Sequence, residues 1–407
     1  MARLSDICLK IGSGATPTGG KSAYLMKGIS LIRSQNVLDI SFAEDGLAYI
    51  SDEQARKLQN VEILEGDILL NITGDSVARV CIVPNHILPA RVNQHVAIIR
   101  VDKTKADNNY ILYSLIKSKK TLLALASAGS TRNALTKKMI EEFEVFLPSL
   151  AEQKRIASIL SSLDDKIAVN RRINANLEAQ AEALFKSWFV DFTPFKDQPF
   201  VDSELGPIPQ GWKVGKLGDY CEVKSGYAFK SSWWTNKGYK IIKIKNISEN
   251  GDINLNDCSC VLPENCDKAK NFIANTGDIV IAMTGATIGK FNIIPKIDEK
   301  FYINQRVGKF FLGEKPIEKV PYIYCFLKQE NISTQIIQKG QGSAQPNISG
   351  ADIESIPMLT PMSIILKYNK MCQPLFEKIL SNRLESKKLS ALRDTLLPKL
   401  MSGEIKL

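Results

Sequence analysis

The chain has 407 residues, which is too long for one ordinary domain and enough to bury two hydrophobic cores. Hydrophobic residues make up 44% and charged residues 24%, the composition of a soluble globular protein. The sequence opens without a secretory signal and has no apolar run near the roughly 20 residues of a membrane helix, so we expect a cytoplasmic protein with no membrane partner. The net charge of +10 suits a polyanionic partner but does not identify one.

The first part of the chain predicts a mixed α/β domain over residues 1–149. Short β-rich runs at 28–37, 67–73 and 96–101 are separated by turns that contain Gly, Asn and Asp. A helical pattern at about residues 109–128 closes this domain.

A long helix is predicted next, over residues 150–190. Ser149 and Glu152 have the spacing of a capping box, and no Pro or Gly follows Pro148 within the helix. The apolar positions alternate between steps of four and three, which is the spacing of a coiled-coil seam. The predicted seam residues of this helix are Ile156, Leu160, Leu163, Ile167, Asn170, Leu177 and Leu184. At about 1.5 Å per residue the helix is a rod of roughly 60 Å, which needs a partner along its length.

The rest of the chain repeats the first part. A Pro-rich linker at 191–211, which we expect to be extended, leads to a second mixed α/β domain at 212–361, closed by a helix at about 322–339. Among the repeated motifs are Leu4-x-Asp6-x-Cys8 with Leu217-x-Asp219-x-Cys221, Gly66-Asp67-Ile68 with Gly277-Asp278-Ile279, and Asn93-Gln94 with Asn304-Gln305. One unit is therefore duplicated in tandem, and the predicted fold is α/β (α+β) with a pseudo-two-fold internal repeat.

A second long helix and its tail occupy residues 362–407. Its predicted seam residues are Ile379, Asn382, Leu389 and Leu396, which align with those of the first long helix. We expect the two helices to pair as an antiparallel coiled coil, with Asn170 and Asn382 paired in the core to fix the register. The alternative is that each helix is an ordinary amphipathic helix packed on its own domain.

Motifs for catalysis and for metal binding are missing. The glycine-containing loop at 14–22 has Ala15 where a nucleotide-binding loop needs Gly. The chain has only two His, no His-Glu-x-x-His and no Asn-Pro-Pro-aromatic tetrapeptide of amino-methyltransferases. Cys258, Cys260 and Cys266 cluster without a His and without the usual zinc spacing. We therefore expect no catalytic residue, no cofactor and no metal in this chain.

Three features occur together around the first long helix: the start Leu147-Pro148-Ser149-Leu150-Ala151-Glu152-Gln153, the end Leu184-Phe185-Lys186-Ser187-Trp188-Phe189, and the opener Ile208-Pro209-Gln210-Gly211-Trp212 of the next domain. With the duplicated layout, they make the chain resemble the specificity subunit of Type I restriction–modification systems. The resemblance extends over essentially the whole chain.

This resemblance implies two target-recognition domains, each reading one half of a split site in double-stranded DNA. It also implies that the paired helices set the gap between the two halves and help to recruit two modification (methyltransferase) subunits. Two restriction subunits that act as motors would complete the assembly. S-adenosylmethionine, ATP and Mg would then be used by the partner subunits and not by this chain.

Side chains that read bases or phosphates gather in four repeated polar clusters. The candidate DNA-binding residues are Arg33, Gln35 and Asn36 with Lys243, Lys245 and Asn246; Thr73 and Arg79 with Thr284 and Lys290; Gln94 and His95 with Gln305 and Arg306; and Arg132 with Gln345. A turn Asn often bonds its own backbone, so a structural role is the alternative for each cluster.

Two other classes of function stay open at the level of sequence. The chain could be a methyltransferase or nuclease with an unusual active site, although the missing motifs oppose this. It could also be a scaffold whose coiled coil binds only proteins, in which case no assembly would protect a DNA sequence selectively.

Overall fold

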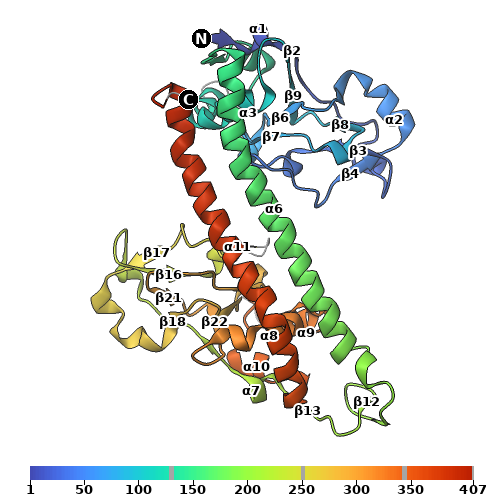
Figure 1. Cartoon of the computed structure of the whole chain (residues 1–407), viewed down its shortest axis with the longest axis vertical. Coiled ribbons are helices and arrows are strands. Elements are labelled where there is room, and N and C mark those ends of the chain that lie inside the picture. Colours follow the sequence, from blue (N-terminus) through green and yellow to red (C-terminus); the bar gives the residue numbers. More distant parts are fainter. Residues whose placement is uncertain (128–132, 249–252, 342–345, 406–407) are drawn as a thin grey trace. The chain divides into compact units, whose positions relative to one another are not determined.

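The protein is represented by a computed structural model that describes residues 1–127, 133–248, 253–341 and 346–405. The chain divides into two compact units: Met1–Ile167 with Lys388–Leu407, and Ala168–Lys387. Each unit contains one globular segment and part of both long helices, α6 (Leu150–Phe189) and α11 (Met362–Ser402) (Figure 1). Within these described ranges, no helix has the length and apolarity needed to cross a membrane.

The globular segment of the first unit alternates short strands and helices. Its elements are β1 (Ala2–Arg3), α1 (Leu4–Ile7), β2 (Cys8–Ser13), β3 (Ile29–Ile32), β4 (Ala48–Ile50), α2 (Asp52–Lys57), β5 (Glu62–Ile63), β6 (Ile68–Asn71), β7 (Val80–Ile82), β8 (Ala90–Val92), β9 (Val96–Val101), α3 (Asn108–Lys117), α4 (Lys119–Ser127), α5 (Lys137–Glu141) and β10 (Glu144–Val145).

The globular segment of the second unit follows a similar order after a short hairpin, with one additional strand, β15, and with 3₁₀ turns in place of helix α2. Its elements are β11 (Phe200–Val201), β12 (Ile208–Pro209), β13 (Val214–Lys216), α7 (Leu217–Tyr220), β14 (Glu222–Ser225), β15 (Trp234–Thr235), β16 (Tyr239–Ile242), β17 (Ser259–Val261), β18 (Ile273–Ala274), β19 (Ile279–Ala282), β20 (Phe291–Ile293), β21 (Phe301–Ile303), β22 (Val307–Phe311), α8 (Val320–Lys328), α9 (Glu330–Gly340), α10 (Gly350–Glu354) and β23 (Pro357–Leu359).

The sheets of the two units have matching topologies. The order β2-β9-β6-β7 in the first unit corresponds to β14-β22-β19-β20 in the second, and β4-β3-β8-β5 corresponds to β15-β17-β16-β21-β18. In each unit one pair of strands is parallel, with Ser30 opposite Ala90 and Lys240 opposite Phe301. The duplicated mixed α/β fold predicted from the sequence is confirmed.

The sheet β2-β9-β6-β7 buries both of its faces. Ile68 and Leu70 face a core that includes Ile156 and Leu160 of α6, whereas Leu69 faces a second core around β3 and β8. Because both faces are covered, β6 is a continuous apolar run and not an alternating one. Strand β19 divides its side chains between two cores in the same way.

Equivalent glycines close each unit where β2 and β14 end. The Gly14 amide donates to the Val96 carbonyl, and the Gly226 amide donates to the Val307 carbonyl, both at 2.9 Å. A Cβ atom at position 14 would lie 2.1 Å from the Val92 carbonyl oxygen. The backbone can come this close only because glycine has no side chain.

Replacing Gly14 with Ala should therefore lower the free energy of unfolding by about 3 kcal/mol, since backbone and not a flexible side chain has to move. Thermal unfolding of the purified chain measures this effect. The matched control is Gly12→Ala, two residues earlier in β2, where nothing lies within 4 Å of an added Cβ. Equal melting temperatures of the two variants would contradict the prediction.

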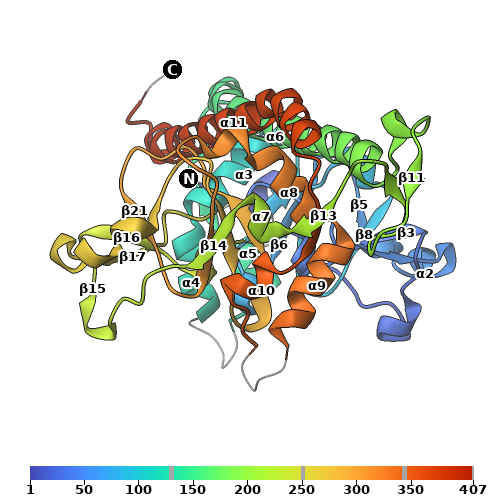
Figure 2. The ribbon, with the colours of Figure 1, turned by 90° about the horizontal axis from the view of Figure 1, so that it is seen from below.

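In each unit the long helices run antiparallel and lie against the closing helix, α3 in the first unit and α8 in the second (Figure 2). In the first unit the Arg393 guanidinium of α11 donates to the Asp164 carboxylate of α6 at 2.6 Å. In the second unit the Asn382 amide donates to the Asn174 side chain at 2.8 Å. Every predicted seam residue of both helices is buried or half-buried.

The expected pairing of Asn170 with Asn382 is wrong. The Asn170 amide instead donates to Glu385 at 2.8 Å and to Ser386 at 3.3 Å, while Asn382 pairs with Asn174. In an antiparallel pair, a residue four positions later on one helix faces a residue four positions earlier on the other. Since Asn170 faces Ser386, Asn174 faces Asn382.

A tyrosine, a carboxylate and an arginine join the closing helix to both long helices in each unit. In the first unit the Tyr113 hydroxyl donates to Asp164 at 2.6 Å, and Asp164 also accepts from Arg393. In the second unit the Tyr324 hydroxyl donates to Glu178 at 3.0 Å, and Glu178 pairs with Arg383 at 3.2 Å. Buried polar networks of this kind are stabilising when every member has a partner.

The single closing helix predicted in each domain is in fact two helices. The first breaks at Ser118, between α3 and α4, and the second breaks at Gln329, whose extended backbone separates α8 from α9. The break lets the second helix turn its apolar residues onto the core, as with Ile332 and Ile336 of α9. Helical periodicity on both sides of a break hides it in the sequence.

The linker is not extended as predicted, because it folds back on the second unit. Strand β11 pairs with β12, and the chain before it forms a short 3₁₀ turn at Thr193–Phe195. The Phe195 ring packs against Trp188 and Trp212, with centroids at 6.4 and 5.0 Å. Burial of these aromatic rings outweighs the preference of prolines for an extended chain.

Candidate nucleic-acid interface

Three of the predicted polar clusters are adjacent in each unit, because the same backbone hydrogen bonds join them. The Asn93 amide donates to the Ile32 carbonyl and the Ile72 amide donates to the His95 carbonyl, both at 3.0 Å. The second unit repeats both bonds at 3.0 Å: the Asn304 amide donates to Ile242, and the Met283 amide donates to Arg306. The turns after β3, β6 and β8 therefore meet at one end of the first unit, and those after β16, β19 and β21 meet in the second.

Asn36 and Asn246 are not available to a ligand, which corrects their assignment as DNA-binding residues. Both side chains are fully buried. The Asn36 amide donates to the carbonyls of Ala43 and Asp45, and its oxygen accepts from the Arg33 amide at 3.0 Å. Asn246 makes the equivalent bonds. The oxygen and the NH2 group of an asparagine in a turn readily form hydrogen bonds with nearby backbone groups, which is the structural alternative raised for these residues.

The other members of the first cluster stay at the surface. Gln35 and Lys245 are exposed, and Arg33 and Lys243 are half-buried. The Arg33 and Gln35 side chains both donate to the Gly46 carbonyl. The Lys243 ammonium donates to the Ser259 hydroxyl at 2.9 Å, and the Lys245 ammonium pairs with Asp257 at 2.9 Å. Burial lowers the pKa of the Lys243 ammonium, and the charge of Lys245 lowers it further.

In the first unit the second and third clusters form one hydrogen-bonded row. The Thr73 hydroxyl lies 2.7 Å from His95 Nδ1, and His95 Nε2 lies 3.1 Å from the Gln94 amide. Gln94 in turn accepts from the hydroxyl of Thr16, which belongs to the glycine-containing loop at 14–22 and was not among the predicted DNA-binding residues. Thr16 comes from the turn after β2, so no local motif could have linked it to Gln94.

Among the described residues of the second unit, the equivalent side chains do not form such a row. Gln305 and Arg306 replace Gln94 and His95, and both are exposed. The Thr284 hydroxyl, equivalent to that of Thr73, is a buried oxygen with no hydrogen-bond partner within the described residues. Arg79 and Lys290 occupy equivalent places beside these turns, since their carbonyls accept from Asn71 and Ala282 at 2.9 and 2.8 Å.

Only part of the fourth cluster lies within the described residues. Arg132 and Gln345 lie outside the described residues. The residues directly after them lie next to the second cluster, because the Gly74 amide donates to the Asn133 carbonyl at 3.2 Å and the Gly285 amide donates to the Pro346 carbonyl at 3.0 Å.

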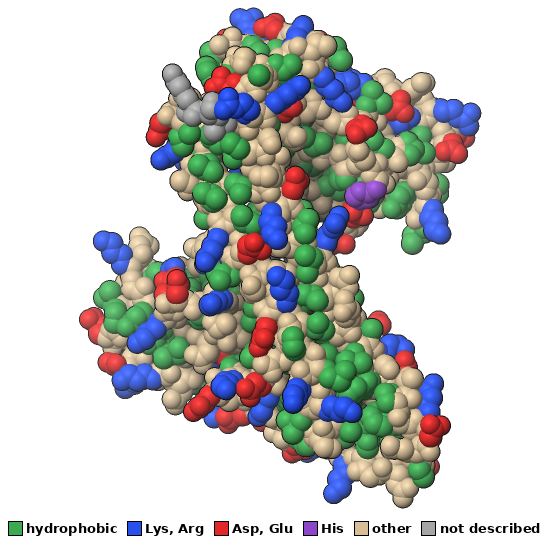
Figure 3. Space-filling view, in the orientation of Figure 1, with side chains coloured by type: hydrophobic (Ala, Val, Ile, Leu, Met, Phe, Trp, Pro, Cys, Tyr) green, Lys and Arg blue, Asp and Glu red, His purple; other side chains and the backbone are tan. Residues whose placement is uncertain are grey.

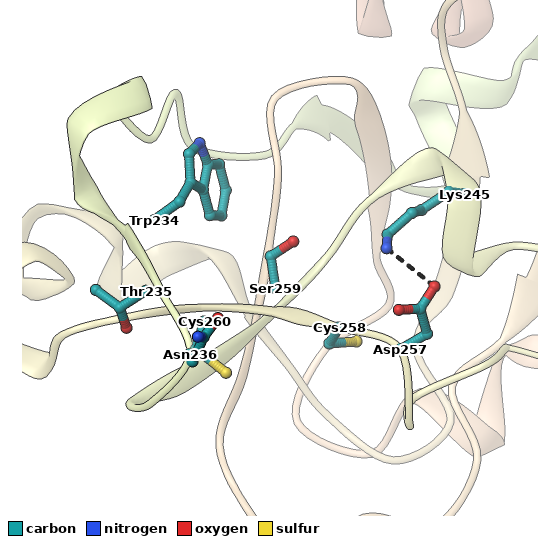
Figure 4. Close-up of a pocket in the computed structure, with 8 residues that line it drawn as sticks. All are labelled: Trp234, Thr235, Asn236, Lys245, Asp257, Cys258, Ser259 and Cys260. Atoms are coloured by element: carbon teal, nitrogen blue, oxygen red, sulfur yellow. Dashed lines mark hydrogen bonds and ion pairs between the residues drawn. The ribbon is translucent and has the colours of Figure 1, made fainter.

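A pocket of about 390 Å³ opens beside the first cluster of the second unit. It is lined by Trp234, Thr235, Asn236, Lys245, Asp257, Cys258, Ser259 and Cys260. The Lys245–Asp257 ion pair lies on one side of it and the Trp234 ring on the other (Figure 4). Burial raises the pKa of the Cys258 thiol to about 11, and no group of three potential metal ligands occurs among the described side chains.

The long helices present a different surface. Basic and acidic side chains are interspersed over the face that carries α6 and α11, without one continuous positive patch (Figure 3).

Two matching polar ends, each with different side chains on the same backbone framework, define a protein with two related recognition domains. Comparison with known families agrees. The family model described as the Type I restriction modification DNA specificity domain matches residues 2–179 and 209–367. The chain belongs to this family and has two copies of its domain, which confirms the resemblance found in the sequence.

Similar proteins span nearly the whole chain. The MjaIX specificity subunit of a Type I restriction enzyme from Methanocaldococcus jannaschii is 30% identical over 98% of this chain and 91% of its own length. The HindI specificity subunit from Haemophilus influenzae is 24% identical over 93% of this chain and 94% of its own. The crystal structure of a Type I S subunit from M. genitalium has the same fold, with a TM-score of 0.57, 17% identity, and 98% and 95% of the two chains covered.

Proposed function

We propose that this chain is the non-catalytic specificity subunit of a Type I restriction–modification complex that works in the cytoplasm. Each globular segment reads one half of a bipartite site in double-stranded DNA, and the paired helices set the gap between the halves. The observation that carries the proposal is the repeated polar end: one backbone framework, present twice, bears Arg33, Gln35 and His95 in one unit and Lys243, Lys245 and Arg306 in the other. Different side chains on a common framework suit two unlike half-sites.

The partners follow from this role. The helix pair recruits two modification subunits, which use S-adenosylmethionine to methylate adenine, and two restriction subunits join them as motors that use ATP and Mg. This chain supplies the sequence preference. The coiled coil suits a fixed gap because its buried pairs, such as Asn382 with Asn174, hold one register.

The test is to co-express the chain with a modification subunit that assembles with it and to map adenine methylation across the host DNA. We expect a split motif of two unlike halves separated by a fixed number of bases. A well-formed complex that leaves the DNA unmethylated would favour a scaffold that binds only proteins. Methylation by the purified chain alone would favour an enzyme with an unusual active site.

A further inference from the structure

The turns after β3 and β16 are built on the same internal support. In each, a buried asparagine accepts a hydrogen bond from the backbone three residues before it, Arg33 or Lys243, at 3.0 and 2.9 Å. The same asparagine donates to two carbonyls across the loop, those of Ala43 and Asp45 or of Asn254 and Asp257. The backbone of residues 33–35 and of residues 243–245 is therefore held in equivalent positions.

The side chains on this support differ between the units. Position 33 is Arg and position 243 is Lys, while position 35 is Gln and position 245 is Lys. Gln35 and Lys245 are exposed. Beyond their contacts with Gly46 and Asp257, the Gln35 amide and the Lys245 ammonium keep further polar hydrogens for a ligand. The middle residue has a different role in the second unit, where Ile244 packs against the core.

An aromatic ring fixes the cation in both turns. The Arg33 guanidinium lies 5.4 Å from the centroid of the Tyr24 ring, and the Lys243 ammonium lies 3.3 Å from that of Trp234. A ring on one side and a hydrogen-bond acceptor on the other, Gly46 or Ser259, leave the cation few orientations. A cation that is held in place before binding costs less entropy when it contacts a ligand.

We propose that these two turns are the base-reading loops of the protein: residues 33 and 35 read base-pair edges in one half-site, and residues 243 and 245 read the equivalent positions in the other. Tyr24 and Trp234 are positioning residues. Arg and Lys suit the acceptors of guanine in the major groove, and Gln suits adenine. The pocket between Trp234 and Lys245 leaves room for a base edge in the second unit (Figure 4). This inference rests on the proposed function and adds the residues that carry its specificity.

The experiment exchanges the chemistry of the two loops in the assembled complex. One variant is Arg33→Lys with Gln35→Lys, and the reciprocal variant is Lys243→Arg with Lys245→Gln. The control is Arg56→Lys with Gln59→Lys, the same chemical change at exposed residues in or just after helix α2. Each complex is incubated with DNA in which one half-site is randomised and the other is fixed, and the methylated molecules are sequenced.

We expect each loop variant to change base preference in its own half-site by roughly tenfold or more at one or two positions, with the other half and the gap unchanged. The control should keep the original preferences. An unchanged motif, or a uniform loss of methylation over all sequences from a variant that melts like the parent, would overturn the inference. If a loop variant melts early, the reciprocal one decides. If the parent complex shows no split motif, the proposed function fails instead.

Discussion

Replacing Lys309 with Met should lower the free energy of unfolding by about 3–5 kcal/mol, because it leaves a buried carboxylate without its cation. The Lys309 ammonium lies 2.6 Å from Asp278, and the two side chains are only 6% and 2% exposed. The ammonium also donates to the Ile273 carbonyl at 2.8 Å, and Asp278 accepts from the Asn275 amide at 2.7 Å. A loss of this size corresponds to a fall in melting temperature of roughly 10 °C for a unit of this length.

The pH dependence of the variant provides a second readout. Burial raises the pKa of the Asp278 carboxyl, and the charge and hydrogen bond of Lys309 oppose that rise. Without Lys309 the folded state should hold the proton more tightly than the unfolded state does. The stability deficit should therefore shrink as the pH falls through the raised pKa of the folded state, and it should be largest above that pKa.

The control is Lys270→Met, which removes an exposed cation paired with Asp267 at 3.5 Å in the same unit. Pairs of this kind contribute little to stability, so its melting temperature should match that of the parent. Thermal unfolding at several pH values measures both variants. If Lys309→Met melts with the control at every pH, the ion pair is not the stabilising contact that its burial indicates.

The same carboxylate shows what an internal repeat can and cannot reveal. Asp67 and Asp278 were aligned from the sequence, and both are almost completely buried at the same turn. Their cations are not at equivalent positions. Arg100 of β9, which pairs with Asp67 at 2.8 Å, is equivalent to Phe311 of β22. Lys309 of β22, which pairs with Asp278, is equivalent to Ile98 of β9. Either position on the strand brings a long side chain to the turn, so the partner can move without changing the fold.

Regular patterns gave reliable boundaries because they extend over many residues. The helix predicted at residues 150–190 corresponds to α6, which runs from Leu150 to Phe189, since a heptad pattern averages over many turns. The predicted pairing of Asn170 with Asn382 was wrong for the opposite reason. Which residue of α11 faces Asn170 depends on the offset between two helices, and nothing near Asn170 in the sequence encodes that offset.

Residue type alone could not show which polar side chains of a cluster are available to DNA and which are buried and stabilise the turn. Asn36 and Arg33 are both polar members of one turn, but only the structure shows that Asn36 points inward and bonds backbone. Tyr24 and Thr16 were missed because they reach the clusters from other elements. Contacts between segments that are distant in the chain leave no local signal in a single sequence.

Reversing the charge of Lys245 and Arg306 together should reduce the affinity of the assembled complex for its DNA site by about a hundredfold or more. Both side chains are exposed, so the change to Glu should not disturb the core. Lys243 is better left in place, because it packs on Trp234 and bonds Ser259, and its loss would alter the fold of the turn. Assembly with the modification subunits should be unaffected.

The matched control is Lys296→Glu with Lys315→Glu, two exposed lysines in the same unit. Lys290 and Arg306 lie directly before β20 and β22, whereas Lys296 and Lys315 lie after the other ends of these two strands. The measurement is the dissociation constant of the complex for DNA that carries the motif found by methylation mapping, as a function of salt concentration. The control should bind like the parent, and binding by Lys245→Glu with Arg306→Glu at the parent affinity would remove these residues from the interface.

The salt dependence then separates two kinds of contact. If Lys245 and Arg306 neutralise phosphates, the double variant should lose about two units of the slope of log K against log salt, and it should weaken on all sequences equally. If they read bases, the slope should change less, and the preference for the correct second half-site should fall. The second outcome is the one that the base-reading role of Lys245 requires. A loss shared equally by all sequences would instead assign both side chains to the phosphate backbone and overturn the base-reading role of Lys245.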